Sequence, residues 1–301
     1  MNQYPLSGTG VALVTPFKKG GAVDYPALER IIENCIDGGV DFLVSLGTTG
    51  EAITLSAKEC LEVFDFTIKV NKGRLPVVAG LFGRNDTASL IGKIKSFNFD
   101  GFDYMMSSSP SYNKPSQEGI YQHFMAIQEV APRPIIIYNV PGRTSSNMTA
   151  DTTLRLAKAS EKFIAVKEAS GDLLQASKIL KYKPKHFAVL SGEDPLTLPM
   201  MGLGGTGVIS VIANAFPFEF SEMVRAANEG DYASARHYHE LLLDIHPHLY
   251  VDGNPAGIKA AMHMMNLCEN ELRLPLVPCS NTTYENLASE IEKVSLANKI
   301  S

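Results

Sequence analysis

Cysteine is scarce in this sequence of 301 residues, which contains only Cys35, Cys60, Cys268 and Cys279. None of the four forms a C-x-x-C pair, and so few cysteines do not indicate a disulfide scaffold. Each is expected to be a small buried apolar residue. The expected location of such a chain is the reducing cytoplasm.

Basic residues are not in excess either, because 27 Lys and Arg stand against 32 Asp and Glu, for a formal charge of -5. No basic face for nucleic-acid binding is therefore predicted. The sequence has no run of about 18 apolar residues, so no membrane span is expected. Its first residues lack the basic and apolar regions of a signal peptide. With 45% hydrophobic residues, the chain can form a large folded core.

Eight short apolar runs recur along the chain and are predicted to be strands. Most are nearly continuous rather than alternating, as expected for parallel strands that are covered on both faces. The runs are residues 11–15, 41–46, 76–80, 102–106, 134–138, 163–167, 187–191 and 207–211.

Helical patterns separate these runs. Asp24 followed by Pro26 predicts a helix start, and Ser56 with Glu59 forms a capping-box pattern. No strand is predicted after about residue 225, and residues 231–301 are predicted to be helical only, with helices at 232–243, 255–267 and 284–294. The alternation predicts an α/β fold, a (β/α)8 TIM barrel over residues 1–230 with a C-terminal α-helical extension over residues 231–301. An open doubly wound sheet is the alternative.

Two motifs are weaker than they look. Residues 202–207 match G-x-G-x-x-G, but they follow a helical pattern and precede a strand, whereas a dinucleotide site needs the reverse order. A tight turn between helix and strand is the better interpretation. His246 and His248 have no third ligand nearby in the sequence, so no metal site is predicted and a surface or helix-end pair is expected.

Lys167 is the anomaly among the predicted strands, because it ends an apolar run and lysine is rarely buried without a reason. Strand alternation places Lys167 on one face with Ala165 and Phe163. Functional groups of a TIM barrel gather at the carboxyl ends of its strands. Lys167 is therefore expected to point into the top of the barrel.

Tyr138 ends the preceding strand and is expected at a matching height, on an axis roughly 4.8 Å away. A free lysine has a pKa of about 10.4, and desolvation disfavours the ammonium. A neutral amine attacks a ketone to form an imine, and a nearby phenol can shuttle the protons. The structural alternative is that Lys167 pairs with a carboxylate such as Glu168 and merely holds the rim.

Other groups follow the predicted strands. Arg143 lies on a Pro-Gly loop and offers a fork suited to a carboxylate, although a surface ion pair would explain it as well. Thr48 and Thr49 lie between two glycines, where hydroxyl and backbone N–H groups suit a second carboxylate. A simple turn is the alternative there.

Six motifs together resemble the dihydrodipicolinate synthase / N-acetylneuraminate lyase superfamily over nearly the whole chain. GTTGE together with YNVPGRT favours the synthase branch. The motifs are GTTGE (47–51), SYNKPSQEG (111–119), YNVPGRT (138–144), VKEASGD (166–172), LSGED (190–194) and GGTGVIS (204–210).

This resemblance implies that Lys167 forms a Schiff base with pyruvate, and that the enamine attacks L-aspartate-4-semialdehyde to give 4-hydroxy-tetrahydrodipicolinate on the way to diaminopimelate and lysine. It implies no metal or organic cofactor, only the covalent pyruvate imine. It also implies a homotetramer built as a dimer of dimers. The implied proton relay is Tyr138, Thr48 and Tyr112, with Tyr112 lent by a neighbouring subunit.

The same resemblance assigns substrate binding to Thr49 (pyruvate carboxylate), Arg143 (semialdehyde carboxylate), Ile209 and Gly192. Many family members also carry a lysine feedback site. At its matching positions this chain keeps only Asn85, so weak or absent lysine inhibition is expected. The departures are Ala57, Cys60, Ser89 and Ser111.

Two other functions compete with this one. A sibling aldolase would cleave a sugar acid such as N-acetylneuraminate or keto-deoxy-gluconate through the same Schiff base. Arg143 discriminates, because it suits a short acceptor that has its own carboxylate. A non-enzymatic binding barrel is the third reading, and the joint presence of Lys167, Tyr138 and Thr48 argues against it.

Overall fold

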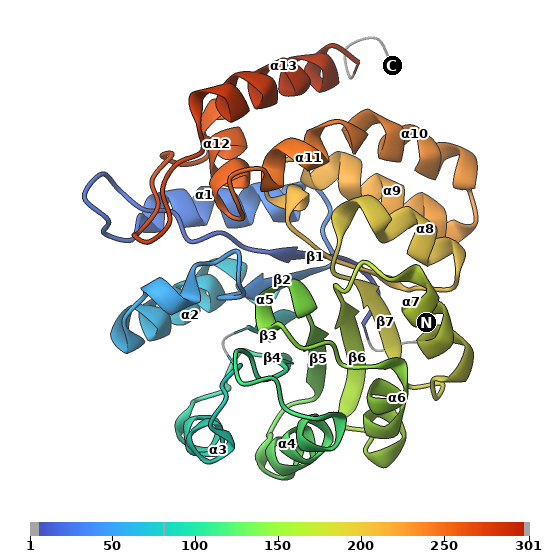
Figure 1. The fold of residues 1–301 in the computed structure, drawn as a ribbon. Coiled ribbons are helices and arrows are strands. Elements are labelled where there is room, and N and C mark those ends of the chain that lie inside the picture. Colours follow the sequence, from blue (N-terminus) through green and yellow to red (C-terminus); the bar gives the residue numbers. More distant parts are fainter. Residues whose placement is uncertain (1–5, 81, 298–301) are drawn as a thin grey trace. The chain divides into compact units, whose positions relative to one another are not determined.

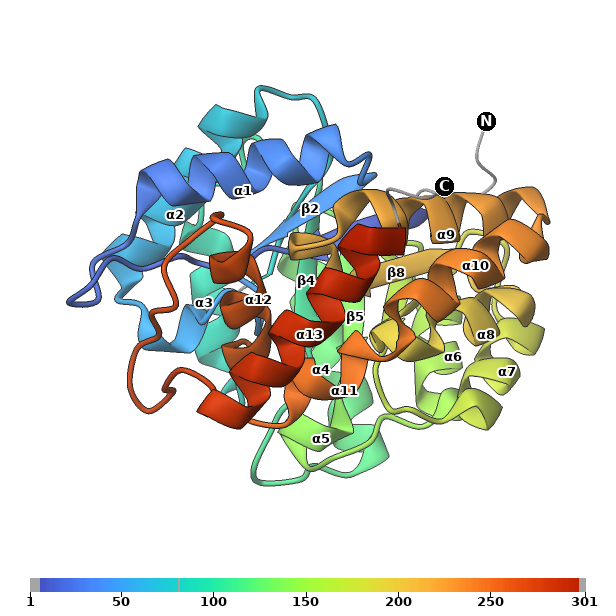
Figure 2. The ribbon, with the colours of Figure 1, turned by 90° about the horizontal axis from the view of Figure 1, so that it is seen from above.

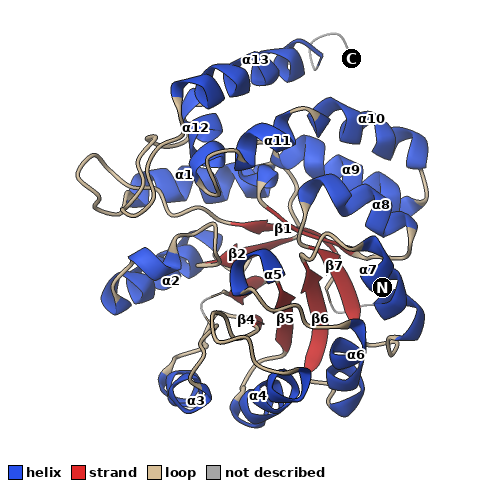
Figure 3. Ribbon diagram, in the orientation of Figure 1, coloured by secondary structure: helices blue, strands red, loops and turns tan. Residues whose placement is uncertain are grey.

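A computed structural model describes residues 6–80 and 82–297 of the chain. The strands form one closed sheet in which each is the neighbour of the next in sequence, and Figure 3 shows how helices alternate with them. This closed order confirms the predicted (β/α)8 barrel and excludes the open sheet. The strands are β1 (Gly8–Ala12), β2 (Phe42–Ser45), β3 (Val77–Ala79), β4 (Tyr104–Ser108), β5 (Ile135–Asn139), β6 (Phe163–Glu168), β7 (Ala188–Ser191) and β8 (Gly207–Ser210).

The chain divides into two compact units. The first contains the described residues up to Gly8 together with Pro76–Ile209, and β5 and β6 run side by side within it (Figure 1). Its helices are α3 (Thr87–Ser96), α4 (Gln117–Val130), α5 (Pro141–Thr144), α6 (Ala150–Ala159), α7 (Leu173–Tyr182), η2 (Asp194–Leu196) and α8 (Thr197–Gly202).

The second unit contains Thr9–Leu75 and the described residues from Ser210 onwards. Within it, α13 packs against α11 and α12, as Figure 2 shows. Its helices are α1 (Tyr25–Asp37), η1 (Ala52–Thr54), α2 (Ala57–Asn71), η3 (Ile212–Asn214), α9 (Pro217–Glu229), α10 (Tyr232–Leu243), α11 (Ile245–Tyr250), α12 (Ala256–Met264) and α13 (Asn281–Ala297). The proposed domain boundary between residues 230 and 231 is not a limit of either unit and stays a prediction.

The predicted helix starts are confirmed. Asp24 caps α1 by accepting a hydrogen bond from the backbone N–H of Ala27, and Pro26 lies in the first turn. Ser56 and Glu59 form a complete capping box at the start of α2. These caps satisfy backbone N–H groups that have no partner inside a helix.

Strand β1 begins three residues before the predicted run. It opens with Gly8 and Gly10, which have low strand propensity, and it ends at Ala12. A Cβ on Gly10 would lie 2.0 Å from the Phe42 ring, so only glycine fits there. Close packing thus overrides the propensity on which the prediction depended.

Strand β6 carries an irregularity that the alternation rule does not foresee. Ile135 pairs with Phe163 but Ile136 pairs with Ala165, which leaves Ile164 as an extra residue. The Phe163 ring packs edge-on against Phe124 of α4, at 6.2 Å between ring centroids. Phe163 therefore faces the helix layer, and its predicted place on the Lys167 face is wrong.

Helix α8 ends within the glycine-rich stretch 202–207, and β8 begins at its last residue. The order is helix, turn, strand, which confirms the predicted tight turn between helix and strand. A Cβ on Gly207 would lie 2.0 Å from the carbonyl oxygen of Gly8.

Among the residues that the structure describes, no helix is long and apolar enough to cross a membrane.

Candidate functional site

Lys167 lies near the carboxyl end of β6 and is 5% exposed, while Tyr138 on β5 is 7% exposed. The two residues are direct register partners. The Nζ of Lys167 lies 4.6 Å from the centroid of the Tyr138 ring. The structure therefore brings the predicted amine and phenol together at matching heights, as the strand reasoning expects.

Glu168 follows Lys167 but points elsewhere. Its carboxylate accepts hydrogen bonds from Nδ2 of Asn139 (3.1 Å to each oxygen), from Nε2 of Gln175 (3.0 Å) and from the backbone N–H of Ser170 (2.8 Å). Asn139 and Glu168 are both buried. Amide groups thus satisfy this carboxylate, on the strand face opposite Lys167.

The alternative role for Lys167, an ion pair with Glu168, is therefore not realised. Across residues 6–80 and 82–297, no ion pair or hydrogen bond holds the Lys167 amine. A buried lysine without a carboxylate partner is uncommon in folded proteins. The arrangement leaves the amine available for chemistry.

Glu193 lies just after β7, and its carboxyl interacts electrostatically with Lys167 and Arg143. Burial and the neighbouring Asp194 raise the pKa of its carboxyl, while the charges of Lys167 and Arg143 act in the opposite direction. Arg143 itself is exposed on α5. Glu193 belongs to the LSGED motif (190–194), but no role was predicted for it from the sequence.

Tyr112 contributes nothing to the interior of its own chain. Its side chain is 89% exposed and its backbone has a left-handed φ of 67°. Its N–H donates to the carbonyl oxygen of Thr144 (3.2 Å), which ties the loop after β4 to α5. An aromatic side chain held outwards in this way is suited to contact another molecule.

The Thr48–Thr49 turn belongs to the second unit. Thr48 is exposed, whereas Thr49 is buried and its Oγ1 accepts a hydrogen bond from Nδ2 of Asn254 (3.0 Å). Glu51 at the end of the motif is also buried. Sequence reasoning did not foresee the Asn254 contact, because it joins residues 205 positions apart.

The remaining predicted binding residues lie at strand ends. Ile209 is fully buried in β8. Gly192 follows β7 and donates its N–H to the Glu168 carbonyl oxygen (2.8 Å). A Cβ on Gly192 would lie 2.5 Å from Cβ of Ala169, so a larger residue does not fit.

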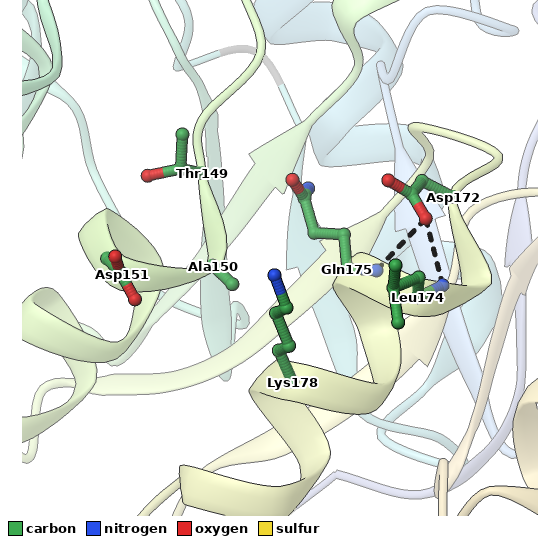
Figure 4. Close-up of a pocket in the computed structure, with 7 residues that line it drawn as sticks. All are labelled: Thr149, Ala150, Asp151, Asp172, Leu174, Gln175 and Lys178. Carbon is green, nitrogen blue, oxygen red and sulfur yellow. Dashed lines mark hydrogen bonds between the residues drawn. The ribbon is translucent and has the colours of Figure 1, made fainter.

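A cavity of about 280 Å³ opens between the first turns of α6 and α7 and contains none of the predicted site residues (Figure 4). Asp172 in its wall caps α7 by accepting from the N–H groups of Leu174 and Gln175. Gln175, which also lines it, donates to Glu168. The lining residues are Thr149, Ala150, Asp151, Asp172, Leu174, Gln175 and Lys178.

Metal-ligating side chains do not gather in the described part of the chain, where no group of three or more His, Cys, Asp or Glu could hold an ion. His246 is buried in α11 with its ring edge-on to Phe220. All four cysteines are buried, and none forms a disulfide within the described residues.

The closed parallel barrel places this protein in the class of TIM-barrel proteins, with a buried lysine beside a tyrosine at the carboxyl ends of two strands. A model of the dihydrodipicolinate synthetase family matches residues 5–294, and the chain belongs to that family.

Individual members of the family align with this chain over almost their whole length. The chain is 50% identical to a 4-hydroxy-tetrahydrodipicolinate synthase of Parabacteroides distasonis over 296 residues, which cover 98% of this chain and 99% of the relative. The crystal structure of dihydrodipicolinate synthase from Aquifex aeolicus has a TM-score of 0.92 and 42% identity, covering 97% of this chain and 99% of that one. The enzyme from Cyanidioschyzon merolae, solved with lysine bound, has a TM-score of 0.91 and 36% identity, covering 96% and 98%.

Proposed function

We propose that the chain catalyses the 4-hydroxy-tetrahydrodipicolinate synthase reaction, condensing pyruvate with L-aspartate-4-semialdehyde in diaminopimelate and lysine biosynthesis. The observation that carries this proposal is the buried Lys167 amine, which is in register with Tyr138 and free of Glu168. The names of relatives at 42–50% identity support the same reaction.

The Lys167 amine attacks the ketone carbon of pyruvate, and loss of water gives the imine. Loss of a methyl proton gives the enamine, whose carbon attacks the aldehyde of the semialdehyde. The amino group of the joined product then closes the ring at the imine carbon and releases Lys167. Each step moves protons, and Tyr138 with Thr48 and Tyr112 would relay them. No metal or organic cofactor is required, because the lysine imine is itself the electron sink.

Substrate carboxylates need fixed donors. In this proposal Thr49 binds the carboxylate of pyruvate, and Arg143 receives the carboxylate of the semialdehyde through its guanidinium fork. Ile209 and Gly192 contact pyruvate. The exposure of Arg143 suits the second substrate, which arrives after the imine has formed.

The working form would be a homotetramer, a dimer of dimers. The support is Tyr112, whose ring is 89% exposed on a left-handed backbone residue and would complete the relay of a neighbouring subunit. The cytoplasm is the proposed location, since the cysteines form no disulfide within the described residues.

Regulation by lysine would be weak or absent. Asn85, the one matching residue that is retained, uses its amide on its own chain: Nδ2 donates to the Ser111 carbonyl oxygen (2.6 Å) and Oδ1 accepts from the Ser111 N–H (2.8 Å). Ser89 accepts from Arg84 and offers no charge. The charged groups of lysine would find no ionic partners at Ala57, Cys60, Ser89 or Ser111.

The test is a coupled assay of the purified protein with pyruvate and L-aspartate-4-semialdehyde, run beside cleavage assays with N-acetylneuraminate and keto-deoxy-gluconate. We expect turnover with the semialdehyde and no cleavage of either sugar acid. Cleavage of a sugar acid without turnover of the semialdehyde would replace the proposal with the sibling aldolase.

A further inference from the structure

Glu51 and Lys259 form an ion pair that is completely buried. The Nζ of Lys259 lies 2.5 Å from Oε1 of Glu51, and both side chains are 0% exposed. The same Nζ donates to the carbonyl oxygen of Glu271 (2.9 Å) and lies 4.2 Å from the centroid of the Phe17 ring. Because desolvation offsets most of the attraction in a buried pair, stability alone is a poor explanation for it.

The pair fixes the end of the Thr48–Thr49 turn. Glu51 has a left-handed φ of 51°, and Leu46 at the other end has a φ of 55°. Such conformations cost free energy in residues with a Cβ and persist only where the surroundings impose them. Lys259 and the backbone N–H of Arg273 (3.3 Å) impose the conformation of Glu51 by binding its two carboxylate oxygens.

Asn254 holds the middle of the same turn. Its Nδ2 donates to Oγ1 of Thr49, at 3.0 Å. A hydroxyl oxygen that accepts this bond keeps its own proton for another acceptor, such as a substrate carboxylate. Oδ1 of Asn254 is buried without a hydrogen-bond partner in the described residues. An unsatisfied buried carbonyl is costly, so stability does not explain this side chain either.

We infer that Asn254 and Lys259, from the segment that follows the barrel strands, are positioning residues that hold the Thr49 hydroxyl as a donor to the carboxylate of a 2-oxo acid. Lys259 anchors the turn through Glu51, and Asn254 orients the hydroxyl. The inference deepens the proposed function and rests on the role of Thr49 within it. It gives Glu51, which has no part in the imine chemistry, a specific task.

The first test uses Lys259→Met, Glu51→Gln and the double variant in the full-length protein. Pyruvate KM and kcat are measured at saturating semialdehyde, and thermal unfolding is followed in parallel. Lys259→Met is expected to raise pyruvate KM by about tenfold, the order of one lost charge-assisted contact, with a much smaller change in kcat. It also lowers the unfolding temperature, because Glu51 is left charged and unpaired.

The double variant separates positioning from stability. It carries no unpaired buried charge, so its unfolding temperature recovers toward that of the wild type. If the pair positions the turn, pyruvate KM stays raised by about tenfold, because the anchor is still absent. A pyruvate KM that returns to the wild-type value together with the unfolding temperature would overturn the role of Lys259.

Lys293→Met is the matched control. It makes the same substitution at a lysine of α13 that is ion-paired with Glu290 at 2.7 Å but 65% exposed. Neither pyruvate KM nor the unfolding temperature is expected to change beyond error, because exposed pairs contribute little. A KM increase equal to that of Lys259→Met would show that the effect is not specific to the turn, and would count against the inference.

The second test uses Asn254→Ala and Asn254→Asp. Alanine removes the donor and raises pyruvate KM. Aspartate raises it further, because the new carboxylate accepts the Thr49 proton and repels the carboxylate of pyruvate. Wild-type pyruvate KM in Asn254→Asp would overturn the role of Asn254.

Failure of the proposed function gives a different result. If the wild-type protein forms no covalent pyruvate adduct, the reaction itself is wrong and the inference falls with it. If the wild type forms the adduct while Asn254→Asp and the double variant bind pyruvate normally, the reaction stands and only the inference is overturned.

Discussion

Lys167 and Glu168 are neighbours in sequence with opposite surroundings. The lysine amine faces the Tyr138 ring, and the glutamate carboxylate faces Asn139 and Gln175. The alternation of a strand produces this separation, because successive side chains leave opposite faces. The Lys167 amine is thereby left without a carboxylate partner among the described residues, while the Glu168 carboxylate is held by hydrogen bonds.

Arg143 provides a test at this scale. Because it is exposed and forms no ion pair in the described chain, Arg143→Ala should leave the unfolding temperature unchanged. Semialdehyde KM should rise by at least about tenfold, the loss expected for a charged carboxylate contact. Trapping of the pyruvate imine should be nearly unaffected. Steady-state kinetics and borohydride trapping measure the two effects separately.

Arg155→Ala is the control, since it removes an exposed arginine that pairs with Glu118. Unchanged semialdehyde kinetics in Arg143→Ala would show that another group receives the acceptor carboxylate.

The ends of β5 and β6 are joined by the polar cluster on their outer face. Asn139 donates to both oxygens of Glu168, and its own Oδ1 accepts from the Met148 N–H (2.9 Å). Gln175 reaches the same carboxylate from α7 (3.0 Å). The cluster holds these strand ends in the register that pairs Tyr138 with Lys167.

Glu168→Gln should therefore destabilise the protein by about 1–3 kcal/mol, the cost of a mismatched buried polar group. The new amide would point a donor at the donors of Asn139 and Gln175. Urea unfolding followed by circular dichroism measures the change. Glu118→Gln, at an exposed ion-paired site, should change stability by less than about 1 kcal/mol. Equal effects of the two substitutions would contradict the role of the cluster.

The first turn of α2 is held to the segment after α12 by Glu59 and Arg273. Hydrogen bonds from Arg273 lower the pKa of Glu59 from 4.5 to about 2. A carboxyl whose pKa is lower in the folded chain stabilises it above pH 4.5, and that contribution disappears as the pH falls toward 2.

Glu59→Gln should accordingly be less stable than the wild type near neutral pH, and the gap should narrow as the pH falls from 4.5 to 2. Denaturant unfolding at several pH values in this range measures the gap. A gap that is constant with pH would mean that the ion pair does not supply the stability.

The elements differ in how far the sequence could predict them. Apolar runs located every strand, and capping residues located the starts of α1 and α2, because both signals are local. The start of β1 was missed because Gly10 is required there by the nearby Phe42 ring and not by strand propensity. The bulge in β6 was missed because Ile164 is an extra residue only when β6 is compared with its neighbour β5. Partners distant in sequence leave no local signal.

The same limit applies to the site. The pairing of Lys167 with Tyr138 could be predicted, since each ends a predicted apolar run and their strands are consecutive. The Glu51–Lys259 pair could not, because its members are 208 positions apart. Glu168 was considered only as a partner for Lys167. Its observed partner, Asn139, is the residue that pairs with it in register on β5.

At the scale of the whole molecule, the proposed reaction leads to diaminopimelate and lysine, and only Asn85 is retained at the positions that match the family's lysine site. The expected result is little inhibition of the wild-type enzyme by lysine at millimolar concentration, measured in the coupled assay. The reason is the loss of charged and stacking partners at four of the five matching positions. Half-maximal inhibition by sub-millimolar lysine would show that a different set of residues binds it.

The most direct measurement is the mass and location of a reduced pyruvate adduct. The protein is incubated with pyruvate and borohydride, digested, and mapped by mass spectrometry. We expect one reduced pyruvate per chain, located on Lys167 and absent from Lys167→Ala. No adduct in the wild type, or an adduct on another lysine that persists in Lys167→Ala, would contradict it.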